Sequence, residues 1–133
     1  MVSLQIRTSA RSQMVNITAQ VADAIRASGL SDGAVLVSVP HTTAGITINE
    51  NADPDVVHDI LAALERCVPW QDPTYRHLEG NSAAHVKASL VGHSAMVPVR
   101  NGRMALGTWQ ALYLCEFDGP RTRNVAVTIL KPD

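Results

Sequence analysis

The stretch that decides the fold is HSAMVPVRNGRMALGTWQALYLCEFDGPRTRNVAVTIL, residues 93–130. Its apolar and β-branched runs at 109–117 and 122–130 are typical of strands. The dipeptide NG at 101–102 favours a two-residue hairpin turn, because both central residues of that turn need positive φ. The tripeptide DGP at 118–120 marks a second turn. This part of the chain therefore predicts successive antiparallel strands.

The remainder of the chain adds helices to that sheet. Strand patterns occupy 2–7, 34–39 and 43–49, and the second is apolar enough to be buried on both faces. Three helices are predicted: from Asn16 or Thr18 to Gly29, from Asp53 to Cys67, and from Asn81 or Ser82 toward Gly92. A long loop, 69–80, separates the last two. We therefore expect an α+β fold, one domain over 1–133 in which three helices partly cover a mainly antiparallel sheet or sandwich.

Composition and charge exclude several classes of protein. Lysine and arginine number 11 and aspartate and glutamate 12, giving a net charge of −1 with no dense basic run, which argues against nucleic acid. No apolar run approaches the roughly 18 residues that cross a bilayer, and no signal peptide is recognisable, so we expect no membrane partner and a cytoplasmic location. Charged residues are only 17% of the chain, which suggests that surface is hidden in a homo-oligomer. Cys67 and Cys115 are widely spaced and predict free thiols.

The first candidate site is a polar strand face that begins at His41. Because side chains alternate along a strand, His41, Thr43, Thr47 and Asn49 share one face. Burying these groups without hydrogen-bond partners would cost free energy. The face is therefore either a solvated sheet surface with ordinary β-favouring threonines or the wall of a polar pocket.

Further histidines suggest a metal site. His77 lies in the long loop and His85 on the following helix, eight residues apart, a spacing compatible with a metal held between a loop and a helix. Taken singly, a histidine is more often a surface or capping residue than a ligand. For His93, which follows the glycine that ends the helix, the structural role is favoured.

Two polar residues interrupt the apolar strand at 109–117. Gln110 and Glu116 share one face and need partners, but they lie roughly 20 Å apart on a straight strand. They reach one small substrate only if the strand bends or a neighbouring subunit completes the site. Beyond the turn, Arg121, with Arg123 two residues further on, could hold a phosphate through its guanidinium, or it is simply an exposed turn residue.

Three segments together resemble the YjbQ-like family. They are HTTAGITINENADPDV at 41–56, HLEGNSAAHVKASLVG at 77–92 and PVRNGRMALGTWQALYLCEFDGPR at 98–121. The resemblance implies a compact α+β fold that assembles as a homotrimer. It also implies a secondary thiamine-phosphate synthase activity, which joins hydroxymethylpyrimidine diphosphate to thiazole phosphate and releases pyrophosphate. The chain is thus expected to be a transferase acting on a small phosphorylated metabolite, or else a trimer that binds a metal or metabolite without catalysis.

The resemblance also implies roles for individual residues. A divalent metal, zinc or magnesium, would be held by His41, His77 and His85. Phosphate would be bound by Lys87 and Arg121, and Thr43 of the polar strand face is a further candidate for this role. The residues with catalytic roles would be Asn49, Glu50, Asp53, Gln110 and Glu116. Asp53 and Glu50 keep a structural alternative, because Asp53 is placed to cap the helix that follows it and Glu50 to bind the same helix start.

Overall fold

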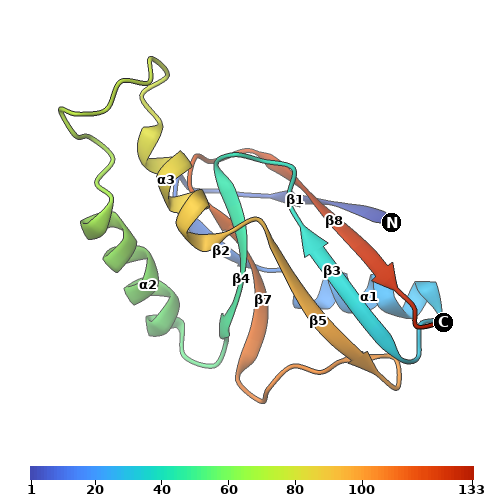
Figure 1. Cartoon of the computed structure of the whole chain (residues 1–133). Coiled ribbons are helices and arrows are strands. Elements are labelled where there is room, and N and C mark those ends of the chain that lie inside the picture. The colour runs from blue at the N-terminus through green and yellow to red at the C-terminus, as the bar shows by residue number, and fades with distance from the viewer.

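The chain forms two antiparallel sheets and three helices (Figure 1). The computed structural model describes residues 1–133. Its strands are β1 Val2–Arg7, β2 Gln13–Asn16, β3 Gly33–Ser38, β4 Ala44–Glu50, β5 Ser94–Arg100, β6 Arg103–Met104, β7 Gln110–Glu116 and β8 Thr122–Leu130. The larger sheet has the order β1-β8-β3-β5-β6 and the smaller one β2-β7-β4. The predicted α+β class is confirmed.

The hairpin turn is also confirmed, whereas one strand was not foreseen. Asn101 and Gly102 have φ angles of 52° and 76°, and they join β5 to β6 as the sequence predicts. The unforeseen strand is β2, whose four residues pair with β7 through contacts such as Met14 with Cys115. Four residues are too few for an alternation pattern to stand out, so tertiary pairing alone defines this strand.

The main core lies between the two sheets, and α1 (Thr18–Ser28) closes it. Ile17, Val21 and Ile25 are fully buried in the same cluster as Val35 of β3. The helix ends at Gly29, whose φ of 72° is the left-handed conformation expected of a helix-terminating glycine.

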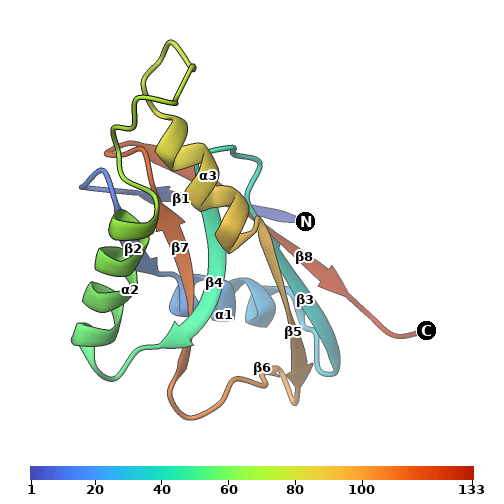
Figure 2. The same ribbon diagram turned by 60° about the vertical axis from the view of Figure 1, so that its left-hand side comes forward.

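The central strand β3 differs from its prediction. Val35 and Val37 are fully buried, but the opposite face carries Leu36, which is only half-buried and pairs with Met96, 61% exposed. The expectation that both faces are buried is therefore wrong for the single chain. The physical reason is that the smaller sheet covers one face only, while no helix packs on the other (Figures 1 and 2).

The two remaining helices cover the outer face of the smaller sheet (Figure 2). They are α2 (Pro54–Cys67) and α3 (Ser82–Val91), joined by the predicted long loop. The Asp53 side chain accepts a hydrogen bond from the backbone N–H of Asp55, and Pro54 follows it, so the predicted start of α2 is confirmed. None of the three helices has the length and apolar character needed to span a lipid bilayer.

Candidate functional site

Two adjoining pockets meet at His85. The histidine pocket has a volume of about 570 Å³, and His41, His85 and His93 are among its lining residues. The polar pocket has a volume of about 250 Å³, and none of its eight lining residues is hydrophobic. Thr42 and His85 line both, so a ligand can extend from one pocket into the other.

His41 is held in one orientation by the neighbouring strand. Its Nε2 accepts a hydrogen bond of 2.9 Å from the backbone N–H of Asn124 on β8. Burial, together with the charge of Arg123, lowers the pKa of His41 below its ordinary value, so the neutral ring is favoured. A neutral ring that accepts at Nε2 carries its proton on Nδ1. In this conformation His41 therefore offers a hydrogen-bond donor, and its Nε2 lone pair is not free for a metal.

His77 and His85 lie close together, as their predicted role requires. Their ring centroids are 5.3 Å apart and the rings meet edge to face. Nε2 of His77 is also 3.9 Å from a carboxylate oxygen of Glu79. Both histidines line the polar pocket, so the loop and α3 contribute one imidazole each.

Asp118 organises the opposite wall of the polar pocket. Its carboxylate accepts 2.8 Å from the Asn81 amide and 3.2 Å from the Arg121 guanidinium, and its carbonyl accepts from Nε of Arg121. Arg121 stays about half exposed, with its side chain 49% accessible. The Asn81 Oδ1 is buried and has no hydrogen-bond partner. Arg121 is thus held by Asp118 at the polar pocket, and about half of its side chain remains accessible there.

Glu116 is anchored below this site rather than exposed in it. It is completely buried, and its oxygens accept hydrogen bonds from the Thr8 hydroxyl, the Asp118 N–H and the guanidinium of Arg123. Arg123 also donates to the backbone and hydroxyl oxygens of Thr43. Burial alone would raise the pKa of Glu116, but the Arg123 guanidinium and the other donors hold it below its ordinary value. The acceptors of Glu116 are therefore occupied. Through Arg123, Glu116 fixes the backbone at Thr43, next to His41.

Sequence reasoning offered Arg123 only as a companion of Arg121 at a phosphate, whereas the structure buries it against Glu116. A signal was present, because Arg123 has the same strand parity as Val125 and Val127, which face the core. A buried arginine needs a carboxylate partner, and Glu116 was already recognised as a polar residue in an apolar strand. Pairing these two residues would have identified the anchor.

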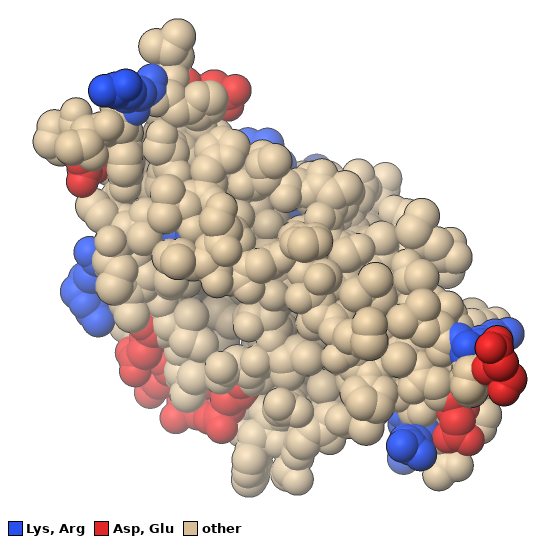
Figure 3. All heavy atoms as spheres, viewed as in Figure 1, with Lys and Arg blue, Asp and Glu red and all other residues tan.

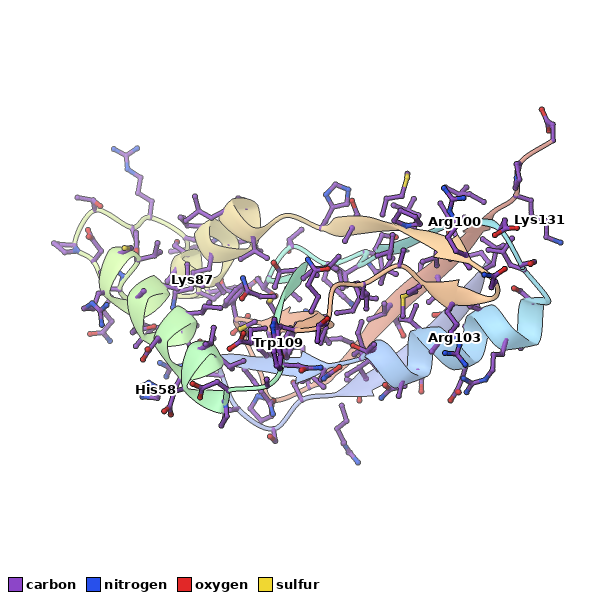
Figure 4. The ribbon with its side chains drawn as sticks, turned by 90° about the horizontal axis from the view of Figure 1, so that it is seen from below. His58, Lys87, Arg100, Arg103, Trp109 and Lys131 are labelled. Carbon is purple, nitrogen blue, oxygen red and sulfur yellow. The ribbon has the colours of Figure 1, made fainter.

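Lys87 lies away from both pockets. Its side chain is almost completely buried, and its ammonium donates to the Glu65 carboxylate on α2. Figure 4 shows Lys87 between α3 and α2, with His58 on the outer side of α2. The hydrogen bond from Lys87 lowers the pKa of Glu65. In this position Lys87 joins two helices and does not reach a ligand in the polar pocket.

The remaining candidates lie at the other end of the β4–β7 pair. Glu50 is opposite Gln110 in the register, whereas Ala44 is opposite Glu116 six residues away. Six residues of strand span roughly 20 Å. The side chain of Asn49 accepts from the Glu50 N–H, Asp53 caps α2, and the side chain of Gln110 accepts from a local backbone N–H. One chain therefore does not bring these four residues to the histidines.

The residues of one chain fit a metal only in part. No three side chains of histidine, cysteine, aspartate or glutamate converge closely enough to hold a metal ion. His77 and His85 supply two imidazoles of a suitable kind. A complete site would need a further ligand from a substrate or from another chain.

Known proteins match this chain along nearly its whole length. The family described as UPF0047 protein YjbQ-like matches residues 2–132. YugU of Bacillus subtilis (strain 168) is 52% identical over 128 residues, 96% of this chain and 97% of the relative. A relative from Methanocaldococcus jannaschii is 50% identical over 126 residues, 95% of this chain and 91% of its own. The crystal structure of an uncharacterized conserved protein from Clostridium acetobutylicum agrees with a TM-score of 0.95 at 52% identity and covers 98% of this chain and 100% of that chain. The chain therefore belongs to the YjbQ-like UPF0047 family.

Proposed function

We propose that the protein is an enzyme of small phosphorylated substrates and that thiamine-phosphate synthesis is one reaction within its reach. The observation that carries the proposal is the wholly polar pocket that Arg121 lines together with the His77–His85 pair. A guanidinium and imidazole N–H groups suit phosphate oxygens, since charge-assisted hydrogen bonds to anions are strong. The specific reaction rests on the family resemblance.

The start of α3 strengthens the site for an anion. Asn81 precedes the helix, and His85 lies in its first turns, so the positive end of the helix dipole is beside the polar pocket. Arg121, His77 and the helix start would together bind a diphosphate. The adjoining histidine pocket would hold the organic part, with the His41 Nδ1–H donating to it.

These contacts would assist the bond exchange. In the proposed reaction a ring nitrogen of the thiazole phosphate forms a C–N bond to the pyrimidine methylene carbon. The C–O bond to the diphosphate breaks, and pyrophosphate departs with the electron pair. Positive groups already placed around the departing oxygens lower the barrier, because they stabilise charge that grows in the transition state.

A divalent metal, zinc or magnesium, is part of the proposal. His77 and His85 would hold it, and a phosphate oxygen or a residue of a neighbouring subunit would add the missing ligand. When bound, such an ion supplies further positive charge to the leaving group. Elemental analysis of the purified protein tests this directly, and His85→Ala is expected to lose the ion.

We also propose a homo-oligomer, most simply the trimer that the family resemblance implies. The outer face of the larger sheet is uncovered and mostly uncharged, with Leu36, Met96 and Thr128 as cross-strand neighbours. Figure 3 displays a broad area without lysine, arginine, aspartate or glutamate over β5 and α3. Burying this face between copies would remove apolar surface from water. The mass in solution is the measurement.

The experiment for the function is pyrophosphate release from the two thiamine precursors. Arg121→Ala is expected to lower kcat/KM about 10- to 100-fold, the worth of one charge-assisted hydrogen bond. His58→Ala is the matched control, because His58 lies exposed on the far side of α2. No turnover of any phosphate ester or diphosphate by the wild type would overturn the proposal.

A non-catalytic binder is the second candidate. It is favoured by the hydroxyl of Ser89 in the histidine pocket, which donates to the carbonyl of His85 and is not hydrogen-bonded to an imidazole that could activate it as a nucleophile. Calorimetric binding of pyrophosphate that depends on Arg121, without turnover, would support this alternative.

A further inference from the structure

A separate cavity lies beneath α2. This apolar crevice has a volume of about 210 Å³, and seven of its nine lining residues are hydrophobic, among them Met14, Leu61, Leu64, Val91 and Phe117. It lies between α2, the end of α3 and the outer face of the smaller sheet, and it is partly open to solvent. No charged residue lines it, and it shares no lining residue with the histidine pocket or the polar pocket.

The face of α2 that lines the crevice stays partly exposed. The helix is amphipathic, yet none of its residues is fully buried. By contrast, Cys115 and Phe117 on the sheet side are 2% and 1% exposed. Protein interiors are usually close-packed, with few voids larger than a water molecule. A space of this size between two apolar surfaces, partly open to solvent, leaves room for a small ligand.

Contacts beyond the crevice hold α2 in place. Glu65, near the end of the helix, pairs with buried Lys87, and the guanidinium of Arg11 lies 4.2 Å from the ring centre of Trp70, just after the helix. At the other end, the Tyr113 hydroxyl donates to the carbonyl of Glu50, shortly before the helix starts. The helix is thus fixed near its ends, while Ile60, Leu61 and Leu64 in its middle both pack toward the sheet and line the crevice.

The lining defines the ligand. A dry apolar cavity of about 150 Å³ in another protein holds benzene, so 210 Å³ is enough for an aromatic ring with one substituent. The polar lining residues are Thr47 and Asn49. The Asn49 oxygen already accepts from Glu50, which leaves its amide N–H groups as donors. We propose that the crevice binds a small uncharged aromatic molecule whose single hydroxyl or carbonyl group meets Thr47 and Asn49.

Phenol and benzene are the probes for this site. The protein is labelled with ¹³C at the methionine methyl groups, and the Met14 signal is followed while each probe is added. Met14 lines the crevice, whereas Met96 lies exposed on the larger sheet and serves as the internal control. A saturable shift of Met14 alone is expected. Absence of a saturable shift up to the solubility limit of both probes would overturn the proposal.

Matched variants locate the binding. Leu61→Trp fills the crevice and should abolish the Met14 response, whereas Leu90→Trp makes the same change at a leucine that is 66% exposed on α3. Thr47→Val should weaken phenol about fivefold and leave benzene unchanged, because it removes one hydrogen bond at constant shape. Equal binding to Leu61→Trp and wild type would place the probe elsewhere and overturn the proposal. If Leu61→Trp fails to fold, the wild-type titration and the Thr47→Val comparison still decide.

Discussion

The polar pocket and the apolar crevice are built in opposite ways. The polar pocket draws its side chains from the segments before β4, around the start of α3 and after β7, and the buried Glu116–Arg123 pair fixes the chain beneath it. The crevice is bounded by one amphipathic helix that rests on a sheet and is held near its ends. One region gains fixed geometry from buried charge, and the other gains space from incomplete packing.

This difference has a thermodynamic side. A buried ion pair is costly to disrupt, because each charge has lost its hydration and depends on the other. A half-exposed apolar helix face loses little when it moves, since water already reaches part of it. Removing the Glu116–Arg123 pair should therefore change the free energy of global unfolding, whereas removing the contacts of α2 should change mainly the local opening of that helix.

Removing the buried anchor should have the largest effect. Glu116→Gln leaves the Arg123 charge without its carboxylate, and we expect the free energy of unfolding to fall by about 3–5 kcal/mol. Denaturant melts followed by circular dichroism give this value. The control is Glu79→Gln, a carboxylate whose side chain is 73% exposed, which should change stability by less than about 0.5 kcal/mol.

Glu116→Gln should also change how the stability of the protein depends on pH in acid. The pKa of Glu116 is lower in the folded protein than in the unfolded one. Its contribution to the free energy of unfolding is therefore present above the unfolded pKa and is lost as pH falls through the folded pKa. Stability of Glu116→Gln should therefore decline less steeply in acid than that of the wild type. If the stability of Glu116→Gln and that of the wild type fall in parallel with pH, titration of Glu116 does not account for the loss of stability in acid.

A smaller effect is expected where α2 meets α3. Glu65→Ala leaves the buried Lys87 ammonium unpaired and should cost about 1–3 kcal/mol. It should also speed alkylation of Cys115, whose pKa burial raises to about 12, in a Cys67→Ser background. Glu65→Ala combined with Lys87→Met is the control, since it removes both charges. If the double variant is as unstable as the single one, loss of helix contacts rather than an unpaired charge is responsible.

The elements of the fold could be predicted because their signals are local. The NG turn, the Asp53-Pro54 helix start and Gly29 each act through the conformation of a few neighbouring residues. The short strand β2 and the one-sided burial of β3 escaped prediction. Both depend on which surfaces meet in three dimensions, and strand periodicity does not carry that information.

The candidate site could be predicted only in part, for the same reason. The sequence correctly placed His77 and His85 together on the loop and the helix, and it put Asp53 at a cap. It did not indicate that Lys87 turns toward Glu65, because a lysine on a helix of small residues looks solvent-exposed. The residue type can be read from the sequence and indicates which chemistry a side chain can perform. The direction in which the side chain points is set by packing and cannot be read in the same way.

The contact at the end of α2 should be weaker than the buried pair. Arg11→Ala removes a cation–π contact with Trp70 and should cost about 0.5–1 kcal/mol, the usual value at an exposed site. Arg7→Ala is a matched control, because it is an exposed arginine on β1 without an ion-pair or aromatic partner among the contacts observed. A loss from Arg11→Ala equal to that from Glu65→Ala would mean that the cation–π contact holds this end of α2 as strongly as the Lys87–Glu65 pair.

The smallest effect concerns His41, which joins the anchor to the histidine pocket. In an NMR titration its midpoint should fall below 6.5, because burial and Arg123 disfavour the charged ring, and its ¹⁵N shifts should report a proton on Nδ1. The contribution of His41 to the free energy of unfolding is present above its unfolded pKa and is lost as pH falls through its folded pKa. The free energy of unfolding of His41→Gln should therefore depend less on pH in that window than that of the wild type. A midpoint at or above 6.5, or a proton on Nε2, would mean that the Asn124 N–H does not hold this ring. His41 would then be free to turn its Nε2 toward a metal. The histidine side of the site would in that case be more mobile than the buried Glu116–Arg123 pair beneath it.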